Sequence, residues 1–206
     1  MTVEQTRILA PPAGRPERRH AAVLFADLSG FTALVETAEP EDVYACVRPL
    51  IDRLVRVVER NGGEIQQVLG DGFMAVFGLG SGDRDAAATS RAAVLTGLAL
   101  VDAGTELSRL PVHVGIECGE VLVSRSWEPA RYAVWGRPVT VATRLCDLAG
   151  PHTVNVGPLA YELGGRYVIT LGGARIQHSW ETRPKGFQRD IHIRSVSAPP
   201  AEVPAA

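Results

Sequence analysis

The chain has 206 residues, of which 46% are apolar and 21% charged, and its net charge is −2. Such a length and composition are typical of one globular domain with a full hydrophobic core. A nearly neutral chain offers no overall basic surface, which argues against nucleic acid or an anionic membrane as a partner. No stretch approaches the roughly 18 consecutive apolar residues of a membrane span, and the N-terminus lacks the apolar core of a signal peptide.

The cysteines and the two chain ends suggest where the domain lies. Cys46, Cys118 and Cys146 are scattered and have no CxxC spacing, so we expect buried thiols in a reducing cytoplasm. Residues 1–18 are rich in Pro, Gly, Ala and Arg, and residues 197–206 are mostly Pro and Ala. Both ends are predicted to be disordered tails. The folded domain is therefore expected over residues 19–196.

The first half of the domain alternates strand and helix patterns. The run from His20 to Ala26 predicts a buried strand, and Gly30 begins a helix. A second helix is expected from Pro40 to about Asn61, with a kink or break at Pro49. Two strands follow over residues 64–69 and 73–77, joined by the tight turn at residues 70–72.

The second half continues this alternation. An Ala-rich helix is expected over residues 83–108, capped by Asp83 or Asp85. Further strands are predicted over residues 112–117, 121–123 and 132–135, and another helix over residues 137–148. Glu117 and Glu120 flank the turn at Gly119 and are expected to be solvated. The order βαββαβ predicts an α+β, ferredoxin-like core with helices on one face of the sheet.

Two aspartates stand at the ends of apolar strand patterns. Asp27 follows the first strand, and Asp71 lies in the turn between the next two. Taken singly, each is as well explained as a turn residue that caps its own backbone. Because an unpaired buried charge is costly, two such carboxylates on neighbouring strands would form a site for a hard divalent cation. The five histidines show no metal-ligand spacing, which argues against a zinc site.

Four segments, in order, carry a family resemblance. They are the Phe-Ala-Asp-Leu-Ser-Gly-Phe-Thr motif at residues 25–32, residues 62–63 with 69–71, residues 115–121, and residues 135–145. Together they resemble the class III adenylate/guanylate cyclase catalytic domain, over about residues 20–196. The resemblance implies a ferredoxin-like core with cyclase-type extensions, which acts as a head-to-tail homodimer. It also implies conversion of a nucleoside triphosphate to a cyclic 3′,5′-monophosphate and pyrophosphate, with two Mg²⁺ or Mn²⁺ ions per site.

The resemblance also assigns roles to individual residues. Asp27 and Asp71 would bind both ions, helped by the backbone carbonyl of Leu28. The partner subunit would supply Arg144, which stabilises charge on the α-phosphate, and Lys185, which reaches the terminal phosphates. The backbone amides of Gly30, Phe31 and Thr32 would bind phosphate. Amides at a helix N-terminus also suit phosphate binding on physical grounds alone.

Three positions depart from the family pattern. Gln67 replaces a lysine that contacts adenine, Ala133 replaces an aspartate or threonine that accepts from the adenine amino group, and Thr140 replaces an asparagine that orients the ribose. An unpaired base amino group costs about 1–3 kcal/mol. A lost transition-state donor can lower the rate by about 10²–10³. The expected function is therefore ATP cyclisation to cyclic AMP that is weak or atypical, with GTP not favoured.

Two rival interpretations remain open at this stage. The three substitutions are also consistent with a degenerate cyclase-homology domain that binds nucleotide, or only dimerises, and regulates a partner. A palm-type nucleotidyltransferase or diguanylate cyclase would share the βαββαβ order but requires a Gly-Gly-Asp/Glu-Glu-Phe type of turn, which this sequence lacks.

Overall fold

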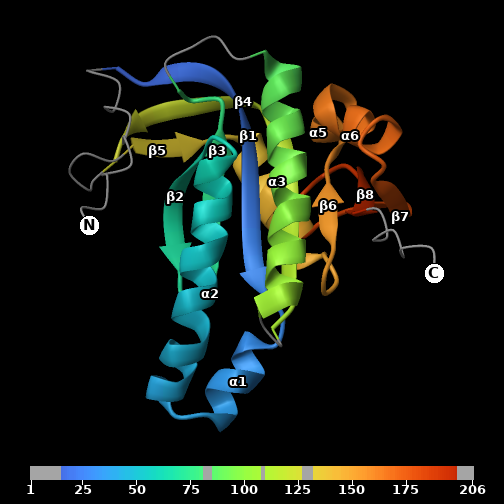
Figure 1. Ribbon diagram of the computed structural model, residues 1–206. Helices are drawn as coiled ribbons and strands as arrows, with labels where there is room; N and C mark the ends of the chain where they lie inside the picture. The colour runs from blue at the N-terminus through green and yellow to red at the C-terminus, as the bar shows by residue number, and fades with distance from the viewer. Residues whose placement is uncertain (1–14, 81–84, 108–109, 127–131, 199–206) are drawn as a thin grey trace.

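A computed structural model describes residues 15–80, 85–107, 110–126 and 132–198 of the chain (Figure 1). Its strands form one sheet in the order β2-β3-β1-β4-β6-β8-β7, with β5 paired to β4. The strands are β1 (Glu17–Leu28), β2 (Gly63–Leu69), β3 (Gly72–Phe77), β4 (Val112–Arg125), β5 (Tyr132–Trp135), β6 (Val154–Val156), β7 (Arg175–Thr182) and β8 (Ile191–Ser197). The helices are α1 (Phe31–Thr37), α2 (Pro40–Arg60), α3 (Ala86–Leu107), α4 (Arg137–Asp147), α5 (Pro158–Ala160), the π-helical turn η1 (Tyr161–Gly165) and α6 (Arg166–Thr170).

The first four strands form the predicted ferredoxin-like core. β1 pairs antiparallel with β3 on one side and with β4 on the other, and β2 pairs with β3. This order, β2-β3-β1-β4 with α2 and α3 as the crossovers, is the one that the βαββαβ pattern predicts. Figure 1 shows α2 and α3 side by side over the same face of the sheet. The α+β prediction is therefore confirmed.

Helix α2 forms because its apolar residues recur at helical spacing. Its buried side chains are Val47, Leu50, Ile51, Leu54 and Val58, and Pro40 occupies the first turn, where a missing N–H costs nothing. The break predicted at Pro49 does not occur: α2 runs unbroken from Pro40 to Arg60. Pro49 is exposed, so the carbonyl that loses its helical hydrogen bond can be solvated instead.

Helix α3 is long and apolar enough, by length and composition alone, to cross a membrane over residues 86–105. More than half of this stretch, 56%, is buried inside the molecule, where it packs on the sheet beside α2. Its apolar composition is therefore explained by the core. The Asp85 carboxylate accepts the backbone N–H of Ala87 and caps the helix, whereas the alternative cap Asp83 lies outside the described residues.

The opposite face of the sheet is covered by α4. Val139 and Ala142 of α4 pack against a second apolar cluster that includes Val23 and Val121. Val141 and Leu145 pack against Ile191 and Ile193 of β8. The prediction of helices on one face therefore holds for the ferredoxin-like core and not for the whole domain, because α4 needs its own apolar surface.

Three boundaries differ from the sequence prediction. β1 begins at Glu17 and β8 ends at Ser197, so the strands extend into residues 17–18 and 197, which were assigned to the tails. The turn predicted at Gly119 is absent, because β4 continues to Arg125 and pairs with the early part of β1. Gly119 adopts φ 146°, a conformation that favours glycine and lets the strand bend without ending.

Glu117 is buried, with 1% of its surface exposed, and the prediction that it is solvated is wrong. Its Oε1 accepts the backbone N–H groups of Cys118 and Ala160, both at 2.9 Å. Burial raises the pKa of the carboxyl group, while these two donors act in the opposite direction. Glu117 therefore ties β4 to the short helix α5 through a buried acceptor that the alternation of strand residues does not reveal.

We expect Glu117→Ala to lower the free energy of unfolding by about 2–5 kcal/mol, because it leaves two buried N–H donors unpaired. Glu117→Gln keeps an acceptor oxygen and should cost less. The folded-state pKa of Glu117 is raised, so its contribution to stability is greatest below the unfolded pKa and declines as pH rises through the folded pKa. Urea unfolding between about pH 4.5 and 7 should therefore show a weaker pH dependence for Glu117→Gln than for the parent. Equal losses for both variants would contradict this role.

Candidate active site

The two aspartates of the sequence prediction lie together at one end of the central strand. β1 pairs with β3 so that Ala26 faces Phe73, which brings Asp27 beside the turn that carries Asp71. A Cβ atom placed on Gly72 would lie 2.8 Å from Asp27 Oδ1. Any larger residue at position 72 would therefore displace this carboxylate. Gly70, on the other side of Asp71, has φ 63°, which suits glycine in a tight turn.

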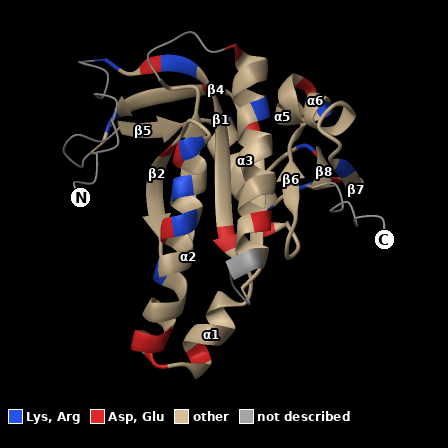
Figure 2. Ribbon diagram, viewed as in Figure 1, with Lys and Arg blue, Asp and Glu red and all other residues tan. Residues whose placement is uncertain are grey.

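The protonation of Asp71 depends on its surroundings. Burial, and then the negative charge of Asp27, raise the pKa of Asp71 from 3.8 to about 6. Asp27 remains accessible, with 45% of its side chain exposed. Figure 2 shows acidic residues at the end of β1, whereas basic residues gather along α2. Two mutually repelling carboxylates that are open to solvent suit the binding of a divalent cation, whose charge would relieve the repulsion.

These residues could supply only part of a metal's ligands. No group of three or more His, Cys, Asp and Glu side chains in the described part of the chain could hold a metal ion. Hard cations such as Mg²⁺ are commonly bound by one or two carboxylates, with substrate phosphates and water completing the coordination. The donor set of Asp27 and Asp71 therefore fits Mg²⁺ or Mn²⁺ together with a phosphate ligand, and the backbone carbonyl of Leu28 lies next to Asp27 in the chain.

The segment after Asp27 turns into α1. Gly30 adopts the left-handed conformation, with φ 84°, immediately before the helix. Phe31 and Thr32 begin α1, and the first amides of a helix have no partner within it. Phe31 packs against the core, whereas Thr32 is exposed. The three residues predicted to bind phosphate thus follow Asp27 closely in the chain, at the start of α1.

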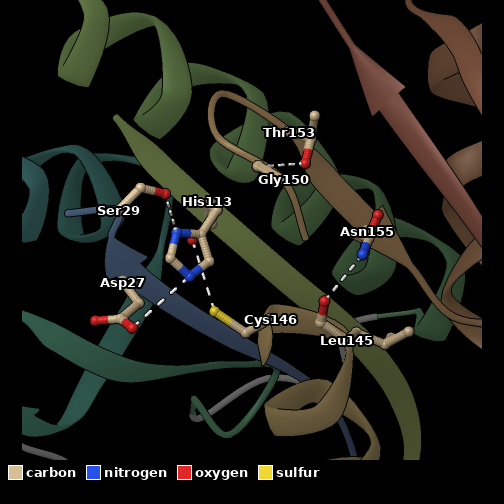
Figure 3. Close-up of polar contacts among 8 residues, drawn as sticks. All are labelled: Asp27, Ser29, His113, Leu145, Cys146, Gly150, Thr153 and Asn155. Atoms are coloured by element: carbon tan, nitrogen blue, oxygen red, sulfur yellow. Dashed lines mark hydrogen bonds and ion pairs between the residues drawn. The ribbon is translucent and has the colours of Figure 1, made fainter. Parts of the chain in front are cut away.

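His113 is a residue of this site that the sequence prediction did not include. It lies on β4 directly opposite Asp27, and its Nε2 atom is 3.7 Å from Asp27 Oδ2 (Figure 3). Its Nδ1 atom is 2.9 Å from the Ser29 hydroxyl. Burial lowers the pKa of His113 more than the charge of Asp27 raises it. No motif signals this contact, because it depends on the register between two strands that are far apart in sequence.

A second group of predicted residues lies on α4 and in the loop between β7 and β8. Thr140 and Arg144 are four residues apart, so they lie on one face of the helix. Thr140 is exposed, and the Arg144 guanidinium donates to Asp147 Oδ2 at 2.8 Å. Lys185 is exposed between β7 and β8, in a loop whose Phe187 ring lies 6.0 Å below the Arg137 guanidinium at the start of α4.

The two predicted base-recognition residues lie on β2 and β5. Gln67 is exposed, next to an irregularity in the pairing of β2 with β3. Ala133 is half-buried and pairs with Ser124 near the end of β4, whereas Asp27 pairs with His113 near its start. The Tyr132 hydroxyl donates to Glu64 at 2.8 Å and so connects β5 to β2. Figure 1 shows β5 at the opposite end of the sheet from the end of β1.

A model of the Adenylate and Guanylate cyclase catalytic domain matches residues 15–178. The chain belongs to this family. Uncharacterized protein Rv1319c of Mycobacterium tuberculosis is a relative of this cyclase domain, 33% identical over 141 residues, which are 66% of this chain and 25% of that protein. The chain therefore spans about a quarter of the length of the curated relatives it matches.

Solved cyclases share the fold of this domain. The adenylyl cyclase CyaB from P. aeruginosa superposes with a TM-score of 0.79 and 25% identity, over 89% of this chain and 96% of that one. The guanylyl cyclase Cya2 superposes with a TM-score of 0.76 and 24% identity, over 93% of this chain and 98% of that one. The fold is thus that of a class III nucleotide cyclase domain, and these similarities do not separate ATP from GTP as the substrate.

We expect Asp71→Asn to stabilise the metal-free cyclase domain at about pH 7.5. The pKa of Asp71, raised to about 6, means that this group favours folding most below pH 3.8 and loses that contribution as pH rises through 6. The gain over the parent in urea unfolding should therefore shrink towards pH 4. Millimolar Mn²⁺ should raise the melting temperature of the parent and not of the variant. Asp190→Asn, which removes an exposed carboxylate elsewhere, serves as the control. A variant that gains nothing at either pH would contradict the repulsion.

Proposed function

We propose that this domain converts ATP to cyclic AMP and pyrophosphate, with two Mg²⁺ or Mn²⁺ ions held by Asp27 and Asp71. The observation that carries the proposal is the pair of adjacent, partly exposed carboxylates, one of them with a pKa of about 6, in a chain of the cyclase family. Such a pair has little structural use, because its mutual repulsion destabilises the fold at neutral pH. A bound cation turns this repulsion into attraction.

Each side chain of the site has a defined task in this proposal. Asp27 and Asp71 bind the cations, together with the Leu28 carbonyl, and the amides of residues 30–32 face the phosphates. When bound, the divalent ions favour ionisation of the ribose 3′-hydroxyl and neutralise charge on the phosphates. Arg144 stabilises the charge that develops on the α-phosphate, and Lys185 neutralises the terminal phosphates. The Thr140 hydroxyl takes the place of the amide that orients the ribose.

The proposal requires a second copy of the chain. Thr140 and Arg144 lie on α4, where Arg144 binds Asp147 of its own helix instead of either aspartate. Ala133 pairs with Ser124 near the end of β4, whereas Asp27 pairs with His113 near the start of that strand. A head-to-tail homodimer would bring the α4 face and the β2 and β5 residues of one chain to the aspartates of the other. Each site would then combine two half-sites, as a symmetric dimer allows.

The base pocket supports ATP as the first substrate to test. Gln67 can both donate to and accept from a base edge, whereas Ala133 offers no side-chain hydrogen bond. Recognition of the base would therefore be weaker by about 1–3 kcal/mol than with a full set of partners. We expect slow turnover and poor selection against GTP, in a cytoplasmic domain without nucleic acid or membrane partners.

A second function is favoured by the same substitutions. Ala133 and Thr140 remove a base contact and a ribose contact at once, which suits a domain that binds nucleotide or dimerises without turnover. Such a domain would regulate a partner. The two functions differ in a single measurable property, which is the formation of cyclic product that depends on Asp71.

We expect the purified chain, with Mn²⁺ and ATP, to form cyclic AMP at a rate that Asp71→Ala lowers by at least about 10²-fold. Product is quantified by chromatography, first with ATP and then with GTP. The Glu162→Ala variant, which removes an exposed carboxylate on η1, should retain activity. If a folded dimer binds Mn²⁺ and ATP but forms no product from either nucleotide, the proposed enzymatic activity is wrong and the regulatory function takes its place.

Complementation between two inactive variants tests the shared site. Asp71→Ala and Arg144→Ala should each be inactive as homodimers, because each removes a group from both sites. When the two are mixed and allowed to exchange subunits, half of the dimers carry one intact site. About a quarter of the parental activity should then return. Confirmed heterodimers without activity would mean that the aspartates and Arg144 do not act across the dimer.

A further inference from the structure

Asp27 is held between two neighbours that face its two carboxylate oxygens. Oδ1 lies on the side of β3, 2.8 Å from where a Cβ of Gly72 would stand, and therefore towards the turn that carries Asp71. Oδ2 lies on the side of β4, 3.7 Å from His113 Nε2 (Figure 3). The two oxygens thus differ in their surroundings: one faces the candidate metal site and the other faces an imidazole.

The imidazole is fixed in place from several directions. Only 12% of the His113 side chain is exposed, and β4 pairs with β1 on one side and with β6 from Val114 onwards on the other. The Cys146 thiol of α4 contacts the His113 backbone carbonyl at 3.7 Å. The backbone N–H of Ser29 donates to Pro111 at 2.8 Å, which keeps the Ser29 hydroxyl 2.9 Å from His113 Nδ1.

These contacts select one tautomer of the neutral ring. With the proton on Nε2, the ring directs an N–H at the negative Asp27 Oδ2 and leaves Nδ1 free to accept the Ser29 hydroxyl proton. With the proton on Nδ1, the Nε2 lone pair would face the carboxylate, and the two would repel each other. The charge of Asp27 therefore favours the Nε2–H form, and the Ser29 hydroxyl, which can donate or accept, is compatible with it.

We propose that His113 is a positioning residue for Asp27: its Nε2–H, fixed by the Ser29 hydroxyl, holds the Asp27 carboxylate so that Oδ1 faces the metal site. This inference rests on the proposed function. A donor that faces Oδ2 leaves Oδ1 turned towards Gly72 and the turn that carries Asp71. Such a donor orients the ligand before the metal arrives.

Binding of Mn²⁺ alone to the full chain, measured by electron paramagnetic resonance, tests the proposal without turnover. His113→Phe keeps a ring and removes both nitrogens, and it should weaken Mn²⁺ binding by about 10–100-fold. His113→Gln restores an amide N–H near the position of Nε2 and should recover most of the loss. Ser29→Ala should cause a smaller loss, because it removes one contact that positions the ring and leaves the Nε2–H in place.

The fold offers a matched control on β8, beside the edge strand β7. His192 of β8 lies 2.7 Å from the Ser179 hydroxyl through Nε2 and 3.7 Å from Glu181 through Nδ1. This Ser–His–carboxylate arrangement resembles that of Ser29, His113 and Asp27 but belongs to β7 and β8. His192→Phe should therefore leave Mn²⁺ binding unchanged, and an equal loss in both Phe variants would overturn the proposal.

The ring nitrogens provide a readout that a merely structural role would not move. In ¹⁵N-labelled parent protein, the nitrogen chemical shifts of His113 should be those of the Nε2–H tautomer, and Asp27→Asn, which removes the charge that favours this tautomer, should shift them towards a mixture. An Nδ1–H form in the parent would overturn the proposal. If the parent itself fails to bind Mn²⁺, the proposed function fails as well. Parental Mn²⁺ affinity in a folded His113→Phe protein would overturn the role of His113 alone.

Discussion

The position of β1 between β3 and β4 is the constraint on which the rest of the structure depends. The register that pairs Ala26 with Phe73 and Asp27 with His113 places one carboxylate between a turn aspartate and an imidazole. Leu24, Ala26 and Leu28 point into the core under α2 and α3, so a slip by one residue would bury Asp27 there instead. The hydrophobic pattern of β1 therefore fixes both the core and the position of the candidate ligand.

Stability and function make opposite demands at this end of the sheet. Burial, and then the negative charge of neighbouring Asp27, raise the pKa of Asp71 to about 6. Elsewhere a buried carboxylate takes part in holding the fold together: Glu117 accepts two backbone N–H groups through Oε1, while its Oε2 is buried without a hydrogen-bond partner. Glu117 thus supports the fold through its hydrogen bonds, whereas the Asp27–Asp71 pair lowers the free energy of unfolding at neutral pH.

The predicted site residues of the single chain fall into separate groups, which is the basis for proposing a second copy. Asp27 and the segment of residues 30–32 lie at the end of β1, while Thr140 and Arg144 lie on the face of α4 and Ala133 on β5. In the single chain, Arg144 forms an ion pair with Asp147 of its own helix. Family membership and fold establish a nucleotide cyclase domain, whereas the effect of the side chains at positions 67, 133 and 140 on substrate selection and turnover belongs to the proposed function.

The sequence by itself determined the element order, the ferredoxin-like core, the family and the neighbourhood of Asp27 and Asp71, because strand and helix periodicity and tight-turn residues are local signals. Only the tertiary structure placed His113 and Ser29 behind Asp27, buried Glu117 under α5 and continued β4 through Gly119. These features depend on the register between strands and on the packing of distant segments. Such contacts follow from the whole sheet and leave no spacing in the sequence by which they could be found.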